Sequence, residues 1–199
     1  MKRYAKKNFP VEKTRRFLEP GPIVMVSSAY KGERDIMTMG WHMMLGFEPA
    51  LVGCFIWDRN HSFELIRRSK QCVINLPTVD LIDKVIDIGN THASGGGGGG
   101  GGRGGGGKGR DKFEQFGLTA LPATKVTAPL IAECYANFEC RLIDTSLINR
   151  YSLFVFEVVK AHVATAPRYP TTLHYRGDGV FMISGRNVSR RRRFKRVNL

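Results

Sequence analysis

The sequence lacks a long hydrophobic run. No apolar stretch of its 199 residues approaches the roughly 20 residues that a membrane-spanning helix requires. The basic N-terminus is also not followed by the apolar core of a signal peptide. We therefore expect a soluble, cytoplasmic protein with no membrane partner. The length suits one domain, or one domain with appendages, and is sufficient to bury a sizeable core.

Cysteines and clustered metal ligands are also scarce. The four cysteines form no CxxC pair, and three of them lie in apolar, strand-like runs. Such positions are typical of reduced, buried thiols and argue against a disulfide framework. The five histidines are scattered, without an HExxH or CxxH motif, so we predict no metal site.

Acidic residues are nearly absent from the two ends of the chain. The formal net charge is +14, but residues 1–16 hold seven Lys and Arg against one Glu, and residues 186–199 hold seven against none. The body between them is close to neutral. Terminal runs of this kind are usually solvated and mobile, so we do not expect a nucleic-acid partner. The alternative is that residues 190–196 grip a phosphate-rich partner.

One segment contains almost no side chains. Residues 95–109 include 13 glycines, interrupted only by Arg103 and Lys108. Glycine loses the most backbone entropy on ordering and has no side chain to bury, so we expect a flexible loop. The tract satisfies a GxGxxG pattern trivially, and Gly109 stands where a P-loop needs Ser or Thr. We therefore reject both nucleotide motifs.

Apolar and alternating patterns predict a β-rich chain. Residues 136–142 alternate between apolar and polar side chains, which is the period of a half-buried strand. Residues 151–163 are apolar on both faces, as expected for a strand covered on two sides. Many strands, few short helices and no regular βαβ alternation indicate a mainly β fold, a barrel with short helices. Further strands are expected over 22–29, 51–57 and 71–76, and helices over 63–68, 81–89 and 112–116.

Five short motifs occur in a fixed order along the chain, over residues 37–44, 60–63, 73–77, 111–113 and 177–179. In this order they resemble the flavin reductase-like, FMN-binding split-barrel family, with the closest likeness to the branch that contains flavoredoxin. The resemblance runs from about residue 17 to about residue 193 and is broken only by the glycine tract. It divides the chain into a basic extension (1–16), a split-barrel domain (17–185) and a basic tail (186–199).

This resemblance implies a flavoprotein that binds FMN. The cofactor requires donors and positive charge for its phosphate, hydrogen bonds for the isoalloxazine edge, and an apolar wall for the ring face. Arg59, Asn60, His61 and Ser62, at a predicted helix start, supply a cation, a hydroxyl and free backbone N–H groups. A plain N-cap with a surface arginine is equally compatible with the residues alone. The family pattern favours the phosphate role, for Ser62 first.

The segment 38–42 is the candidate site for the flavin ring and the ribityl chain. Thr38, Met39, Gly40, Trp41 and His42 supply a hydroxyl, exposed N–H groups and a large aromatic. The alternative is that Trp41 and most of the methionines belong to the core. Gly40 stands where the family commonly has Ser, which removes that hydroxyl. A solitary histidine is more often a structural hydrogen-bond partner than a base, so His42 is assigned at most a positioning role.

Two further residues match family motifs. Lys112 lies in the Asp-Lys-Phe motif and is expected to neutralise the phosphate or the reduced N1 region of the flavin. A solvated helix lysine is the alternative. Asn75 lies in the Asn-Leu-Pro motif and is expected to fix a turn rather than to contact a ligand.

No residue is assigned a catalytic role. Ser27, Ser28 and Ser62 lack a GxSxG context, and no carboxylate pair is spaced as in hydrolases. Hydride transfer needs neither arrangement, since the flavin performs the chemistry. We therefore predict an NAD(P)H-dependent flavin oxidoreductase, an enzyme that passes electrons from NADH or NADPH to an acceptor. The family implies a homodimer with each cofactor near the subunit interface.

Two other functions stay open. A tightly bound FMN electron-transfer carrier, as in flavoredoxin, would take electrons from a redox-protein donor. A basic-tailed binding protein would have kept the barrel and lost the cofactor. In a dimer, the basic tail would also be able to reach a neighbour's cofactor or the phosphate of a nicotinamide dinucleotide.

Overall fold

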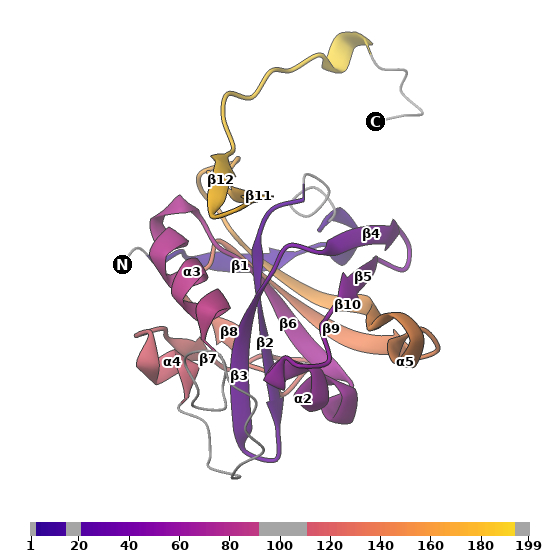
Figure 1. Ribbon diagram of the computed structural model, residues 1–199. Coiled ribbons are helices and arrows are strands. Elements are labelled where there is room, and N and C mark those ends of the chain that lie inside the picture. Colours follow the sequence, from indigo (N-terminus) through magenta and orange to yellow (C-terminus); the bar gives the residue numbers. More distant parts are fainter. Residues whose placement is uncertain (1–2, 15–20, 92–110, 194–199) are drawn as a thin grey trace.

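The described part of the chain is built around one large antiparallel sheet. The computed structural model describes residues 3–14, 21–91 and 111–193 (Figure 1). Strands pair in the order β3-β2-β6-β9-β10-β5-β4, and β1 also pairs with β10. This architecture confirms the predicted mainly β fold. The strands are β1 (Lys6–Phe9), β2 (Val24–Tyr30), β3 (Glu33–Met39), β4 (His42–Gly46), β5 (Leu51–Phe55), β6 (Gln71–Leu76), β9 (Ala136–Asp144) and β10 (Leu153–Ala164).

Short helices and two small hairpins complete the domain. Of the helices, α2 packs on β2 and β3, and both α3 and α4 pack on β3. None of the helices in the described ranges is long and apolar enough to cross a membrane. The remaining elements are α2 (His61–Ser69), α3 (Ile82–Asn90), α4 (Lys112–Gln115), α5 (Ile148–Tyr151), β7 (Ala120–Leu121), β8 (Leu130–Ile131), β11 (Leu173–Gly177), β12 (Val180–Ile183) and the 3-10 helices Val11–Lys13, Val79–Leu81 and Arg191–Arg193.

The predicted elements form close to their expected bounds. The strand over 71–76 has the expected ends, and the one expected over 51–57 stops at Phe55. The helix expected over 63–68 begins two residues earlier, because Asn60 in an extended conformation already serves as its N-cap. The glycine tract lies outside the described residues, as does the end of the basic tail after Arg193.

A tight turn joins β2 to β3 and sets their register. Lys31 and Gly32 have φ angles of 50° and 83°. Positive φ at both central residues is the geometry of a two-residue hairpin loop whose twist matches that of the strands. Glycine adopts this conformation without strain. The turn fixes the register that places Thr38 opposite Met25.

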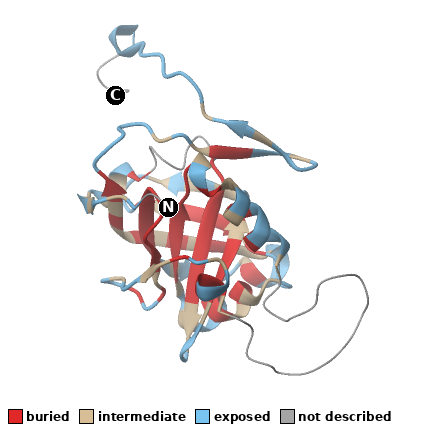
Figure 2. Ribbon diagram, turned by 90° about the vertical axis from the view of Figure 1, so that its left-hand side faces the viewer, coloured by how far each residue is buried: buried red, intermediate tan, exposed pale blue. Residues whose placement is uncertain are grey.

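Both faces of the sheet are covered by apolar side chains. Alternate residues of β2 belong to different clusters, with Val24 and Val26 in the larger one and Met25 in the smaller one. Figure 2 shows the buried strands between more exposed helices and loops. All four cysteines are free and buried, as predicted. Burial raises the pKa of Cys54 and Cys72, so these thiols stay protonated.

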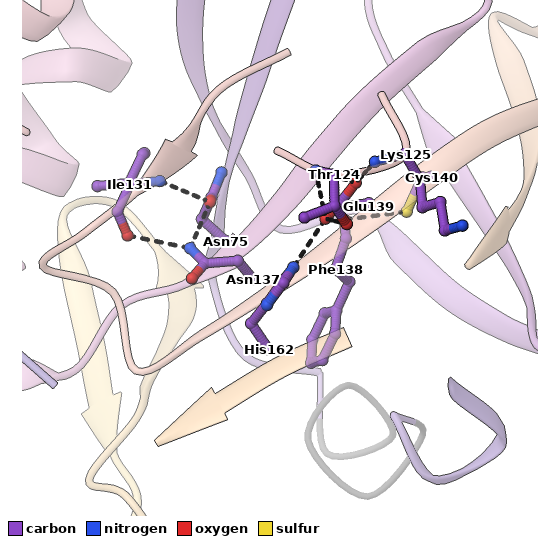
Figure 3. Close-up of polar contacts among 9 residues, drawn as sticks. All are labelled: Asn75, Thr124, Lys125, Ile131, Asn137, Phe138, Glu139, Cys140 and His162. Atoms are coloured by element: carbon purple, nitrogen blue, oxygen red, sulfur yellow. Dashed lines mark hydrogen bonds and ion pairs between the residues drawn. The ribbon is translucent and has the colours of Figure 1, made fainter. Parts of the chain in front are cut away.

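The structure corrects the prediction of a half-buried strand over 136–142. Asn137 and Glu139, which should face solvent, are fully buried on the second face of β9. Glu139 accepts bonds from Thr124 N (3.1 Å), Lys125 N (2.5 Å) and His162 Nε2 (2.7 Å) (Figure 3). The loop before β8 therefore covers this face of β9 with backbone N–H groups. The Glu139 side chain accepts hydrogen bonds from them, which an apolar side chain at this position could not do.

Asn75 connects the same loop to the centre of the sheet. Its side chain donates to Met25 O at 3.0 Å, and its Oδ1 accepts from Ile131 N at 3.1 Å and from Asn137 Nδ2 at 2.7 Å (Figure 3). A buried amide that satisfies both of its ends specifies one arrangement of the backbone around it. Asn75 thus has a structural role, but it fixes the chain at β8 and not, as expected, a turn.

The structure also corrects the expectation of a solvated N-terminal extension. Within residues 1–16, Lys6–Phe9 form β1 and pair with the end of β10, Lys6 opposite Ala164. The Lys6 ammonium donates to Ala132 O at 2.9 Å. Burial lowers the pKa of Lys6. The local sequence did not indicate this strand because its partner lies more than 150 residues away.

The Glu139 cluster generates a prediction about acid stability. Burial alone would raise the pKa of Glu139, but hydrogen bonds from His162, Thr124 and Lys125 outweigh it and hold the pKa below its ordinary value of 4.5. The ionised carboxylate therefore stabilises the fold above that value and loses this contribution as the pH falls below it. Glu139→Gln should reduce the free energy of unfolding by about 1–3 kcal/mol at neutral pH.

Urea unfolding at neutral pH and at about pH 4 measures both effects. The variant should lose less stability on acidification than the wild type does. An unchanged acid dependence would show that Glu139 does not contribute in this way.

Candidate functional site

A small polar hollow unites three clusters that the sequence places far apart. It opens where β3, the N-terminus of α2, the C-terminal end of α3 and the start of α4 meet, and has a volume of about 140 Å³. Of the predicted site residues, Thr38, Arg59, Asn60, His61 and Lys112 line it. Its other lining residues are Asp35, Met37, Ile88, Gly89 and Thr91.

The N-terminus of α2 faces this hollow with unsatisfied backbone donors. Asn60 is the N-cap, with φ −74° and ψ 133°, and makes no side-chain capping bond. The N–H groups of His61 and Ser62, in the first turn, have no acceptor within the helix. Together with the helix dipole they favour an anion at this position.

Two side chains of this end of α2 have partners outside the hollow. The His61 imidazole lies 2.8 Å from a carboxylate oxygen of Glu33. The Arg59 guanidinium lies over the ring of Trp57, 5.2 Å from its centroid. No carboxylate is paired with Arg59 among the described residues, so its charge is available to a ligand.

A buried ion pair forms the floor of the hollow. The Lys112 ammonium lies 2.9 Å from Asp35 Oδ1 and donates to Ile36 O at 2.7 Å. Both ionised side chains are almost completely buried, Lys112 at 4% exposure and Asp35 at 2%. Lys112 is therefore not a solvated helix lysine. Because Asp35 already balances its charge, Lys112 adds little net charge to the hollow.

Ser62 has a different partner from the one that we expected. Its hydroxyl is fully buried and donates to Asp35 Oδ2 at 2.6 Å. It neither lines the hollow nor acts as the N-cap of α2. In this arrangement Ser62 influences the hollow through Asp35, and only its backbone N–H is free for a direct contact with an anion.

The segment 38–42 leaves the hollow after its first residue. The Thr38 hydroxyl donates to Val85 O at 2.8 Å, and Met39 is buried in the core. Gly40 lies close to Ile23, and a Cβ atom added to Gly40 would lie only 2.9 Å from Cδ1 of Ile23. That contact explains why Gly40 cannot be the serine of the family pattern without displacement of Ile23.

Trp41 and His42 point in different directions beyond the hollow. Trp41 is 72% exposed and packs against Phe55, with ring centroids 5.1 Å apart. His42 Nε2 lies 2.7 Å from Pro22 O, and burial lowers the pKa of His42. His42 is thus a neutral imidazole that is hydrogen-bonded to a backbone carbonyl. This agrees with the interpretation of His42 as a structural hydrogen-bond partner rather than a base. The alternative location of Trp41 in the core is therefore wrong, and its cofactor-binding role stays a prediction.

Asp35 is the site residue that the sequence analysis missed. A charged residue inside the β3 segment, next to Ile36 and Met37, was the available signal. Its importance depends on Ser62 and Lys112, which are 27 and 77 residues away in the chain. Local patterns do not report such pairings.

The hollow fits the phosphate-bearing end of FMN. It offers Arg59, the first-turn amides of α2 and the Thr38 hydroxyl, which are groups that bind phosphate and a polyol chain. Its volume of about 140 Å³ is below the ~300 Å³ at which cofactor pockets usually begin. A tricyclic ring would therefore have to lie outside it, beyond Thr38.

The buried pair generates a prediction about stability. Lys112→Met should destabilise the protein by about 3–5 kcal/mol, because it leaves the Asp35 carboxylate buried and unpaired. Adding Asp35→Asn should recover much of this loss, since the double variant buries no charge. Urea unfolding of the wild type, both single variants and the double variant gives the coupling energy. Additive losses would contradict a direct Asp35–Lys112 interaction.

Known proteins share this fold over nearly the whole chain. An FMN-binding domain of a flavin reductases-like enzyme from Shewanella baltica superposes with a TM-score of 0.81 at 23% identity, covering 95% of this chain and 99% of that one. Flavoredoxin of Desulfovibrio vulgaris superposes with a TM-score of 0.72 at 16% identity, covering 86% and 90%. At sequence identities of 23% and 16%, these superpositions show that the fold is shared, and they carry no conclusion about function.

Sequence comparison extends the likeness to relatives of unknown role. YddH of Escherichia coli, described as uncharacterised, is 29% identical over 188 residues, which cover 87% of this chain and 92% of YddH. An uncharacterised protein of Pyrococcus abyssi is 29% identical over 144 residues, which cover 72% and 74%. The family of the flavin reductase like domain matches residues 15–183, so this chain, with its split-barrel fold, belongs to that family.

Proposed function

We propose that this protein is an FMN-binding flavoprotein that acts as an NAD(P)H-dependent flavin oxidoreductase. The observation that supports this most is the hollow itself, because Arg59, the α2 N-terminus and Thr38 meet there and are groups that suit a phosphate and a polyol chain. The FMN-binding proteins of the same fold, such as the Shewanella baltica domain, are consistent with it. Bound FMN would supply the hydride acceptor.

The residues of the hollow would bind and orient the cofactor. Arg59 and the amides of His61 and Ser62 would hold the phosphate, and Thr38 would contact the ribityl chain. Lys112 would act mainly through its ion pair with Asp35, which holds the start of α4 against β3. In this proposal the residues of the hollow position the cofactor, and none of them is assigned the role of a general acid or base.

The protonation state of His42 supports this assignment. Since burial lowers the pKa of His42 and its Nε2 lies against Pro22 O, the imidazole is neutral at physiological pH. A neutral ring that already uses its donor is poorly suited to deliver a proton. Its role in the proposal is to hold β4 beside the start of β2.

We also propose a homodimer that uses the exposed apolar face of β4. Met43 and Leu45 of β4, Trp41 just before it and Phe47 just after it occupy every second position along this edge of the sheet and are each 46–72% exposed. Side chains that alternate in this way lie on one face of a strand. Exposed apolar surface of this kind at a sheet edge marks an association site. A second copy of the chain is the partner that we propose.

The phosphate contact can be tested with two flavins. Arg59→Ala should weaken FMN binding by about 1.5–3 kcal/mol, the value of a charge-assisted hydrogen bond. Riboflavin, which lacks the phosphate, should bind the wild type weakly and be almost indifferent to the change. Flavin absorbance titration measures both affinities.

Arg67→Ala is the matched control, because it removes the same charge from the exposed far end of α2. Equal losses for FMN and riboflavin would show that Arg59 does not contact the phosphate. Absence of any flavin binding well above micromolar concentrations would favour the binding protein that has lost its cofactor.

The second test concerns turnover. NADH or NADPH should bleach the bound flavin in anaerobic stopped-flow experiments, and His42→Ala should slow this step by less than the 10²–10⁴-fold typical of a lost general acid or base. A loss of a thousandfold or more would make His42 catalytic. If only a reduced protein donor bleaches the flavin, the protein is an electron carrier like flavoredoxin.

A further inference from the structure

A second and larger cavity lies away from the hollow. It is an open cleft of about 1040 Å³ between β1, the end of β10 and the β11–β12 hairpin. The hairpin lies just above the large sheet in Figure 1. We call this cavity the basic cleft. Its lining residues are Lys7, Phe9, Leu76, Tyr135, Val163, Ala164, Thr165, Arg168, Tyr169, Pro170, Thr171, Thr172, His174, Ser184, Gly185, Arg186 and Asn187.

The cleft carries positive charge without compensation. Lys7, Arg168 and Arg186 line it, and its lining includes no Asp or Glu. Within residues 3–14, 21–91 and 111–193, none of these three cations forms an ion pair. Like charges that converge on a concave surface raise the local concentration of anions. An anionic ligand would be the partner that completes this arrangement.

One wall of the cleft provides an aromatic surface. Tyr169 is 58% exposed, and the Arg168 guanidinium lies over its ring, 5.3 Å from the centroid. Such a pair presents two flat faces on which a planar ring can stack, next to a donor for phosphate. An inorganic ion would leave this surface unused.

Another part of the lining is fixed by hydrogen bonds. Thr172 Oγ1 lies 2.9 Å from His174 Nε2, and Thr172 N donates to Ser184 Oγ at 2.7 Å. These bonds hold the start of β11 against the end of β12. These bonds fix Thr172, His174 and Ser184 in the lining of the cleft, and Gly185, Arg186 and Asn187 continue the lining beyond β12.

We propose that the basic cleft binds a phosphorylated nucleotide. Three uncompensated cations suit two or more phosphates, the Arg168–Tyr169 pair suits a base, and the volume is that of a dinucleotide-sized site. None of the nucleotide motifs tested on the sequence lies here, because the residues come from both ends of the chain. Only folding brings Lys7 next to Arg168 and Arg186.

A chain of contacts connects the cleft to the hollow. Leu173, between cleft residues Thr172 and His174, accepts a bond from Ile23 N at 2.7 Å. The preceding Pro22 O contacts His42, and the segment from His42 back to Thr38 ends in the hollow. If the proposed flavin function holds, on which this step rests, the nucleotide in the cleft is the reduced nicotinamide donor.

The test is binding of NADP⁺, which cannot reduce the flavin, by isothermal titration calorimetry. We expect the full-length protein to bind it in the micromolar range and more weakly as salt increases. Arg168→Ala/Arg186→Ala should weaken binding at least tenfold, since it removes two charge-assisted contacts from exposed positions. Arg176→Ala, an exposed arginine of the same hairpin outside the cleft, is the control and should bind as the wild type does.

Each other outcome overturns the proposal. These are no binding at millimolar NADP⁺, equal binding by the double variant, adenosine binding as tightly as NADP⁺, or displacement of NADP⁺ by FMN. FMN affinity, measured separately by absorbance, distinguishes the two proposals. Absence of NADP⁺ binding by the wild-type protein, together with intact FMN binding, refutes only the cleft. NADP⁺ binding by the wild type without FMN binding refutes only the flavin function.

Discussion

The site depends on one buried ion pair, Asp35 with Lys112. It joins the middle of β3 to the first residue of α4, and the Ser62 hydroxyl on Asp35 adds the start of α2. A charge at this depth is tolerated only when it is paired and hydrogen-bonded. The three segments must therefore approach each other closely, and this approach is what creates the hollow. The pair also leaves Arg59 as the uncompensated cation there.

The rest of the fold holds the two candidate sites in fixed relation. Asn75 and Glu139 attach the loop before β8 to the sheet, so the second face of β9 is closed by satisfied polar groups. The segment 38–42 then runs from the hollow toward Pro22. Ile23, the residue after Pro22, donates its backbone N–H to Leu173 O of β11, next to the basic cleft. With FMN at the hollow and the nicotinamide nucleotide at the basic cleft, the hydride acceptor and the hydride donor would both lie along the segment 38–42 and its contact with Pro22.

The sequence was sufficient for the mainly β fold, five of its strands, the family and the start of α2. Patterns with period two and the order of motifs are local, so 71–76 and the helix start at Asn60 could be located from them. Three features could not be found in this way. The partner of Ser62, the strand Lys6–Phe9 and the basic cleft all arise from residues far apart in the chain. The polar residues of β9 were misassigned because alternation does not reveal what covers the second face.

The most direct test of this account is a crystal structure of the protein with bound FMN. It should show the phosphate within hydrogen-bonding distance of Arg59 and the amides of His61 and Ser62, with the Asp35–Lys112 pair intact beneath it. The isoalloxazine ring should lie beyond Thr38, outside the hollow. A phosphate bound in the basic cleft, or bonded directly to a Lys112 released from Asp35, would contradict the account.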